Sequence, residues 1–136
     1  MIKDICHDVF FLSQKAVKAT REDVGVGKDL EDTLRANKDR CVGMAANMIG
    51  VNKRIIIVNI GFNNLVMFNP VIINKEEPYT TVEGCLSLPG QRNTTRYQHI
   101  EVEYEDYSFN KKRIKLSGYF AQIAQHEIDH LEGILI

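Results

Sequence analysis

The segment His126-Glu127-Ile128-Asp129-His130 combines residue types that bind a metal ion and activate water. On a helix, residues four apart lie one above the other on the same face, so both imidazoles can bind one ion. Glu127 could then reach a water molecule on that ion without being a ligand itself. The alternative is a polar helix face with two ordinary histidines. The metal site is favoured because burying three ionisable groups is costly unless they are paired or bound to metal.

A catalytic site of this type needs a third protein ligand and one open position. Cys85 is the best candidate, because it lies in the glycine-flanked segment EGCLSLPG (83–90), where the backbone can approach a ligand closely. Its thiolate would bind Zn²⁺ or Fe²⁺, although a cysteine in such a place is also commonly a small buried hydrophobic residue. The other cysteines and histidines lack a supporting motif and are expected to be packing or surface residues: Cys6, Cys41, His7 and His99.

The elements that would position these residues can be predicted from hydrophobic spacing. Apolar residues recur with helical period from Tyr119 to Leu131, which predicts a helix that carries both histidines, with Gly118 and Gly133 at its ends. The segments 54–59 and 65–68 predict two strands joined by a turn, and Pro70 is expected to limit the second one. Alternation over 100–105 predicts a strand with one solvated face, followed by another over 113–116.

The first 40 residues are predicted to be helical. Apolar residues at helical spacing over 9–19 indicate one helix and those over 30–41 a second, with Gly25 and Gly27 in the connection between them. Helices, then strands, then one helix favour an α+β fold over alternating βαβ units. Residues 1–136 are expected to form a single domain.

Composition excludes several classes of function. The chain has 17 basic and 18 acidic residues, with a formal charge of −1, so it is not a strongly basic DNA-binding protein. No apolar run approaches the ~18 residues that span a membrane, and no signal-peptide core follows Met1. We therefore expect a cytoplasmic protein with reduced cysteines, no DNA partner and no membrane association.

Three segments in order resemble the three motifs of the peptide deformylase family: CVGMAANMIG (41–50), EGCLSLPG (83–90) and QHEIDHLEG (125–133). The resemblance covers most of the chain. It implies the peptide-deformylase α+β fold, with antiparallel or mixed sheets around a C-terminal helix that carries HEIDH. It also implies removal of the formyl group from the N-terminal formyl-methionine of new polypeptides. The partners would be a formyl-methionyl peptide or nascent chain, and the ribosome.

Carried over by position, the resemblance assigns roles to individual residues. Cys85, His126 and His130 would bind the metal. Fe²⁺ is the expected ion, with Zn²⁺, Ni²⁺ or Co²⁺ as alternatives. A metal-bound water would be the nucleophile and Glu127 the general acid/base. The backbone N–H of Leu86 would help to hold the oxyanion, and Gly43 and Gly84 would line the substrate path. Glu132 or another carboxylate would orient a ligand imidazole.

The first motif departs from the family pattern at two positions. Cys41 stands where the family has glycine, and Met48 stands where it has the glutamine that donates to the oxyanion. A thioether has no donor, and losing one such donor costs roughly 10²–10³ in turnover. The enzyme could be slow, or Asn47 or a water could replace the amide. The chain could also have kept the fold and metal site without efficient deformylation. Met48 itself could simply fill a gap.

Two arginines follow the second motif. In relatives, basic residues in this region contact the peptide backbone or pair with the motif glutamate, here Glu83. Arg92 is accordingly a candidate substrate-binding residue, and Arg96 a candidate for either role. The alternative is that both are solvated surface arginines.

The competing hypotheses for the whole chain are another metal-dependent amide hydrolase, a protein that binds metal and Met-peptides without efficient turnover, and an interaction protein.

Overall fold

A computed structural model describes residues 1–135. In chain order the elements are α1 (Val9–Leu12), the 3₁₀ turn η1 (Arg21–Asp23), α2 (Val24–Ala36), β1 (Gly43–Ala45), the 3₁₀ turn η2 (Ala46–Ile49), β2 (Ile55–Asn59), β3 (Asn64–Cys85), β4 (Leu88–Glu105), β5 (Lys111–Ser117) and α3 (Gly118–Leu131).

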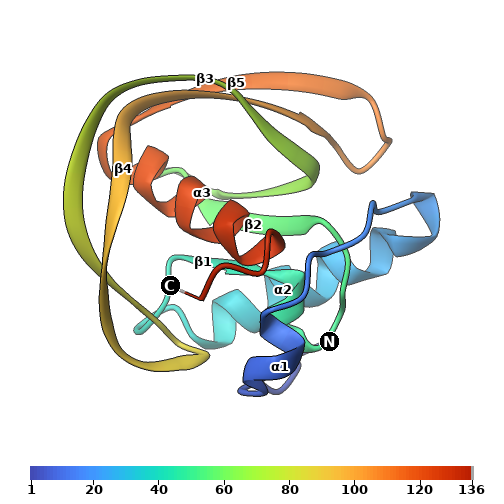
Figure 1. Ribbon diagram of the computed structural model, residues 1–136. Helices are drawn as coiled ribbons and strands as arrows, with labels where there is room; N and C mark the ends of the chain where they lie inside the picture. The colour runs from blue at the N-terminus through green and yellow to red at the C-terminus, as the bar shows by residue number, and fades with distance from the viewer. Residues whose placement is uncertain (136) are drawn as a thin grey trace.

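The five strands form one sheet in the order β1-β2-β3-β4-β5, and every pair is antiparallel. The long strands β3 and β4 curve around α3, and β5 crosses above it (Figure 1). The fold is therefore α+β with the sheet wrapped around the C-terminal helix, which confirms the predicted class.

Strand β2 lies between two hydrophobic clusters, which explains why its run IIIV is apolar at every position. Ile56 and Val58 pack in the cluster that includes α3, whereas Ile55 and Ile57 pack in the cluster that includes α2. Successive side chains of a strand point to opposite faces, so a strand with both faces covered carries no polar alternation.

The helix α3 runs through the centre of the fold, and most of its last ten residues are buried. It begins at Gly118, as expected from the sequence, and ends at Leu131. Gly133 follows with φ of 76°, and a Cβ there would lie 2.3 Å from the Ser13 carbonyl oxygen. A glycine is therefore required where the chain leaves the helix and passes the N-terminal segment.

The predicted helix over 9–19 is wrong beyond its first turn. Helix α1 ends at Leu12, and the next helical element is η1 at Arg21. Val17 pairs with Lys53 in an isolated parallel bridge, and the Ala16 N–H donates to the Leu131 carbonyl. Ala16 and Ala19 are buried by contacts with later parts of the chain and not by an amphipathic helix.

Gly25 and Gly27 lie inside α2, not in a connection before it, and α2 ends at Ala36, before Cys41. A Cβ on Gly27 would lie 2.9 Å from the Tyr107 ring and 3.0 Å from Phe68. Gly27 is therefore a point of close packing between α2 and the sheet, a use of glycine that the sequence does not distinguish from a turn.

Pro70 does not end the second predicted strand. Strand β3 continues through it, with a register shift between Phe68 and Val71 and a φ of 53° at Asn69. A bulge absorbs the residue that cannot donate to the ladder. No helix in residues 1–135 is long and apolar enough to cross a membrane.

Candidate metal centre and adjoining pocket

Three side chains from two distant segments converge on one point. His126 and His130 lie one turn apart on α3, and their Nε2 atoms are 3.2 Å apart. Cys85, at the end of β3, places its Sγ 3.2 Å from His130 Nε2. All three potential ligand atoms lie within 4.8 Å of one another. The structure thus brings together the three residues that the sequence singled out as metal ligands.

The donor set fits a divalent ion. Two nitrogens bound to one tetrahedral ion at about 2.0–2.1 Å lie roughly 3.3 Å apart, close to the observed separation. His126 Nδ1 is 2.7 Å from Glu83 Oε1. An N–H at Nδ1 donates to this carboxylate and leaves the Nε2 lone pair directed at the ligand centre. Burial is the main cause that lowers the pKa of His130 to about 3, so its imidazole is neutral.

Glu83 is the centre of a buried charge network behind the ligands. Arg96 donates to both of its carboxylate oxygens, at 2.7 and 3.0 Å, and Gln122 donates to Oε2 at 2.8 Å. Arg96 also pairs with Asp129 at 2.6 Å. Burial raises the pKa of Glu83, but the hydrogen bonds from His126, Arg96 and Gln122 outweigh it and lower the value to about 2. Glu83 is therefore ionised at neutral pH and fixes the His126 ring.

Glu127 is also a buried glutamate, but its environment differs from that of Glu83. Its Oε1 is buried and has no hydrogen-bond partner among residues 1–135. Burial is the main cause that raises the pKa of Glu127 to about 7. A carboxyl group near its pKa at neutral pH can accept and return a proton. The sequence predicted Glu127 as the general acid/base, and this environment suits that role.

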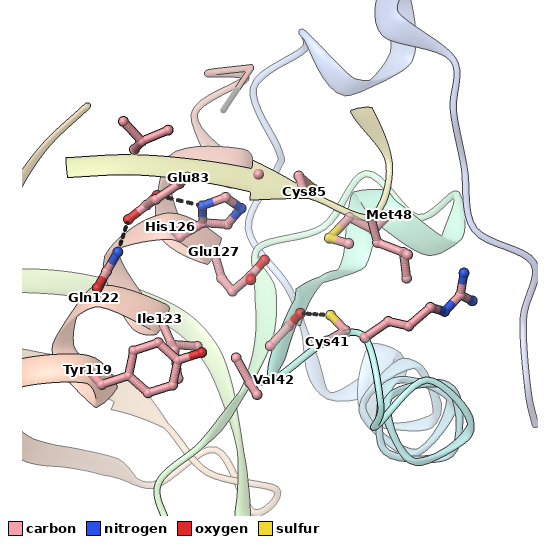
Figure 2. Close-up of a pocket in the computed structure, with 15 residues that line it drawn as sticks. Cys41, Val42, Met48, Glu83, Cys85, Tyr119, Gln122, Ile123, His126 and Glu127 are labelled. Atoms are coloured by element: carbon pink, nitrogen blue, oxygen red, sulfur yellow. Dashed lines mark hydrogen bonds and ion pairs between the residues drawn. The ribbon is translucent and has the colours of Figure 1, made fainter. Parts of the chain in front are cut away.

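A pocket of about 270 Å³ opens beside the ligands (Figure 2). Cys85, His126 and Glu127 line it together with the exposed apolar side chains of Val42, Val82 and Tyr119. Gly43 brings β1 against α3 at this point, because a Cβ there would lie 2.7 Å from Ile123 Cγ2 and 3.0 Å from Glu127 Oε2. Mixed apolar and polar lining next to a perturbed acid is typical of a substrate site.

Four of the other predicted site residues line this pocket, whereas Arg92 does not. Gly84, Leu86 and Met48 line it together with Gly43. Arg92 is outside the lining residues, and its Nη1 donates to the Pro89 carbonyl at 3.3 Å. Arg96 takes the alternative role of pairing with Glu83. Glu132 pairs with Arg54 at 2.9 Å, so Glu83 is the carboxylate that orients a ligand imidazole.

The 3₁₀ turn η2 speaks against one alternative for the missing glutamine, the replacement of its amide by Asn47. The Met48 side chain is buried, and its Sδ accepts a hydrogen bond from the Ala45 N–H at 3.4 Å. Asn47 points elsewhere, since its Nδ2 donates to the His130 carbonyl at 2.9 Å. Asn47 is therefore no substitute donor in the pocket. It instead ties the first motif to the helix that carries the ligands.

Sequence reasoning missed Asp129 and Gln122 as members of the network around Glu83. Asp129 lies within the HEIDH segment, but the metal-binding pattern of that segment gives it no role. Helical spacing was the available signal, because Gln122 precedes His126 by one turn and so lies on its face of α3. What the spacing could not show is that this face meets Glu83 of β3.

Comparison with known proteins agrees with the geometry. A family model described as polypeptide deformylase matches residues 2–136. A peptide deformylase from Clostridium beijerinckii is 57% identical over 136 residues, which cover 100% of both chains. One from Thermomicrobium roseum is 40% identical over 137 residues, which cover 91% of this chain and 77% of the relative.

Solved structures of the family superpose closely. A crystal structure of peptide deformylase from Thermotoga maritima matches with a TM-score of 0.89 at 27% identity, covering 99% of this chain and 95% of that one. A Met-Ala-Ser-bound class I type b peptide deformylase from Acinetobacter baumannii matches with a TM-score of 0.88 at 27% identity, covering 99% and 97%. These likenesses favour a deformylase over a protein that only binds metal and peptides. The chain belongs to the peptide deformylase family of metal-dependent hydrolases, which act on formylated nascent peptides.

Proposed function

We propose that Cys85, His126 and His130 hold a divalent metal, with Fe²⁺ the expected ion, and that Glu127 moves the proton in deformylation. The observation that carries this proposal is the convergence of three ligand atoms next to a buried carboxylate, whose Oε1 has no hydrogen-bond partner among residues 1–135. When bound, a divalent ion supplies Lewis acidity, which lowers the pKa of a water toward about 7 and polarises a carbonyl.

Glu127 takes a proton from the attacking water as the water oxygen bonds to the formyl carbon. It later returns this proton to the leaving amine as the C–N bond breaks. Its raised pKa suits both halves of this task. A carboxyl group with an ordinary pKa would be a weaker base at neutral pH and a poor acid for the second step.

The pocket supplies the remaining functions of the site. The Leu86 N–H, next to Cys85 in the turn between β3 and β4, is the backbone donor for the developing oxyanion. Met48 supplies no donor, so this protein stabilises the oxyanion with one hydrogen bond fewer than the family pattern. Val42, Val82 and Tyr119 suit an apolar first side chain such as methionine, and Gly43 and Gly84 let the peptide backbone approach.

Four further expectations belong to the proposed function. Residues 1–136 act as a single domain, the protein works in the cytoplasm, and it meets its substrate on nascent chains at the ribosome. Arg92, at the start of β4, would contact a longer peptide beyond its first residue.

The test is formate release from formyl-Met-Ala-Ser by protein loaded anaerobically with Fe²⁺ or Ni²⁺. Glu127→Ala is the matched control, because it removes the proton carrier and leaves the three ligands. We expect turnover in the parent and its loss, by roughly 10²–10⁴, in the control at equal metal content. A folded, metal-loaded parent that releases no formate would overturn the proposed function.

A further inference from the structure

The turn that joins β3 to β4 carries the oxyanion donor of the proposed function. Cys85 pairs with Leu88 across the hairpin, so Leu86 and Ser87 form a two-residue turn. This turn directly follows Cys85, the proposed third metal ligand, and Leu86 lines the pocket. The conformation of the turn therefore decides where the Leu86 N–H stands relative to the metal ligands.

The geometry of the hairpin does little to fix this turn. Two-residue hairpin loops favour turns of types I′ and II′, which have a positive φ at the first central residue, because their twist matches that of the flanking strands. Neither Leu86 nor Ser87 has a positive φ. The strand register also shifts between Gly84 and Cys85, which interrupts the ladder next to the turn. Contacts from outside the hairpin are therefore needed to hold the turn in place.

The segment 3–7 near the N-terminus supplies such a contact. His7 Nδ1 lies 3.0 Å from the Ser87 carbonyl oxygen, although 80 residues separate the two along the chain. A carbonyl oxygen can only accept, so Nδ1 carries the hydrogen and donates it. Ser87 is buried, and its own N–H donates to Cys85 Sγ at 3.5 Å. Ser87 is thus held by His7 at its carbonyl and by Cys85 at its N–H.

The segment that carries His7 is itself anchored at two points. The Lys3 N–H donates to Thr33 Oγ1 of α2 at 2.9 Å. The Cys6 N–H donates to the Met48 carbonyl of η2 at 2.7 Å, and Cys6 comes directly before His7. The backbone from which the imidazole reaches the turn is therefore fixed. Both η2 and the turn contribute residues to the pocket, so this segment links two elements that border the site.

We propose that His7 is a positioning residue, which fixes the turn after Cys85 and so directs the Leu86 N–H at the developing oxyanion. The inference rests on the proposed function, in which this N–H is the backbone donor. An oxyanion donor acts mainly in the transition state and adds little to the binding of the ground-state carbonyl. Loss of the His7 contact should therefore lower kcat and leave KM nearly unchanged. An imidazole that served only as an ordinary surface side chain would affect neither.

The test compares His7→Ala with His7→Asn by formate release from formyl-Met-Ala-Ser in protein loaded with Ni²⁺. Asparagine keeps a side-chain N–H near the position of the imidazole Nδ1, whereas alanine removes the donor. We expect kcat to fall by about threefold to tenfold in His7→Ala, the range for one hydrogen bond, and to return to within about twofold of the parent in His7→Asn. His7→Phe keeps a planar ring without a donor and should match His7→Ala.

The matched control is His99→Ala. His99 Nδ1 also makes a hydrogen-bond contact, at 2.8 Å from Ser117 Oγ, but this histidine lies outside the lining of the pocket. The substitution should change neither kcat nor KM. A loss of kcat in His99→Ala as large as that in His7→Ala would overturn the specific role of His7.

Amide hydrogen exchange provides a readout that does not depend on turnover. In protein loaded with diamagnetic Zn²⁺, the Ser87 N–H should exchange about threefold to tenfold faster in His7→Ala than in the parent, because the turn opens more readily. In His7→Asn it should exchange at about the rate of the parent. Equal exchange of this N–H in His7→Ala and the parent would overturn the inference.

The outcomes separate this inference from the proposed function. A parent that releases formate, with kcat unchanged in His7→Ala or no better in His7→Asn than in His7→Ala, overturns the positioning role and leaves the function intact. A parent without turnover counts against the proposed function, while exchange of the Ser87 N–H still tests whether His7 fixes the turn.

Discussion

Replacing Arg96 with methionine would break the buried charge network behind the metal ligands. Arg96 is 3% exposed and makes two hydrogen bonds to Glu83 and one to Asp129. Methionine has a similar length and no charge, so the substitution leaves Glu83 buried without its cation. The hydrogen bonds of Glu83 to His126 and Gln122 would remain.

The magnitude follows from burial. Removing one partner of a buried ion pair costs about 3–5 kcal/mol, because the other charge stays desolvated. For a chain of this size, 1 kcal/mol corresponds to about 3–5 °C in Tm, so Arg96→Met should lower Tm by about 10–20 °C.

The matched control is Arg113→Met. Arg113 pairs with Glu103 at 3.1 Å, but its side chain is 63% exposed, and exposed pairs contribute at most about 1 kcal/mol. Both variants would be measured by thermal and urea unfolding in the same metal state as the parent, because a bound metal adds stability. The double variant Arg96→Met/Glu83→Gln should be more stable than the sum of its single changes, since no buried charge is left alone.

Dependence on pH gives a second readout. The pKa of Glu83 is depressed to about 2 from an ordinary value of 4.5. A depressed carboxyl pKa adds stability above the unfolded-state value, and this contribution disappears as pH falls from about 4.5 to about 2. Arg96→Met should lose part of this acid-dependent stability. Equal losses of stability for Arg96→Met and Arg113→Met would refute the reasoning.

Three other predictions concern the pocket. Because the pKa of Glu127 is raised to about 7, kcat/KM should fall as pH drops below 7 and level off above it; a rate that stays flat from pH 5 to 8 would exclude Glu127 as the base. Met48→Gln should raise turnover with little change in metal content, measured by formate release and metal analysis, and no gain would mean that the oxyanion site is built differently. Gly43→Ala should cost about 1–3 kcal/mol in urea unfolding and lower kcat, since its Cβ would lie 2.7 Å from Ile123. Gly84→Ala, whose Cβ would meet no atom closer than 3.4 Å, should cost less.

Local chemistry made much of the site predictable. The four-residue spacing of His126 and His130 places both imidazoles on one helix face whatever the rest of the chain does. The apolar pattern of 119–131 predicted that helix, and the observed α3 agrees with it. Cys85 was identified from its glycine-flanked segment and from the resemblance, because a ligand on another element leaves no periodic signal.

Contacts between distant segments could not be predicted from residue spacing and local motifs. Ala16 and Ala19 continue the helical spacing of α1, but they are buried by contacts with later parts of the chain and lie outside any helix. Gly27 looked like a turn because nothing in the sequence shows that Tyr107 packs against it. Arg92 is the register partner of Glu83, yet Arg96 is the residue that reaches the carboxylate. This choice depends on how β3 and β4 twist around α3.

The sequence alone therefore determined the chemical groups of the site: two imidazoles on a helix, a thiol in a glycine-flanked segment, and a glutamate beside the first histidine. Spacing along one helix is a local property, so it can be read without knowing the fold. The tertiary structure decided the environments. It placed Glu83 against Arg96 and left Glu127 Oε1 with no hydrogen-bond partner in the described part of the chain, so that two buried glutamates have pKa values of about 2 and about 7. Electrostatic environment depends on which distant side chains meet, and that is fixed only when the sheet closes around the helix.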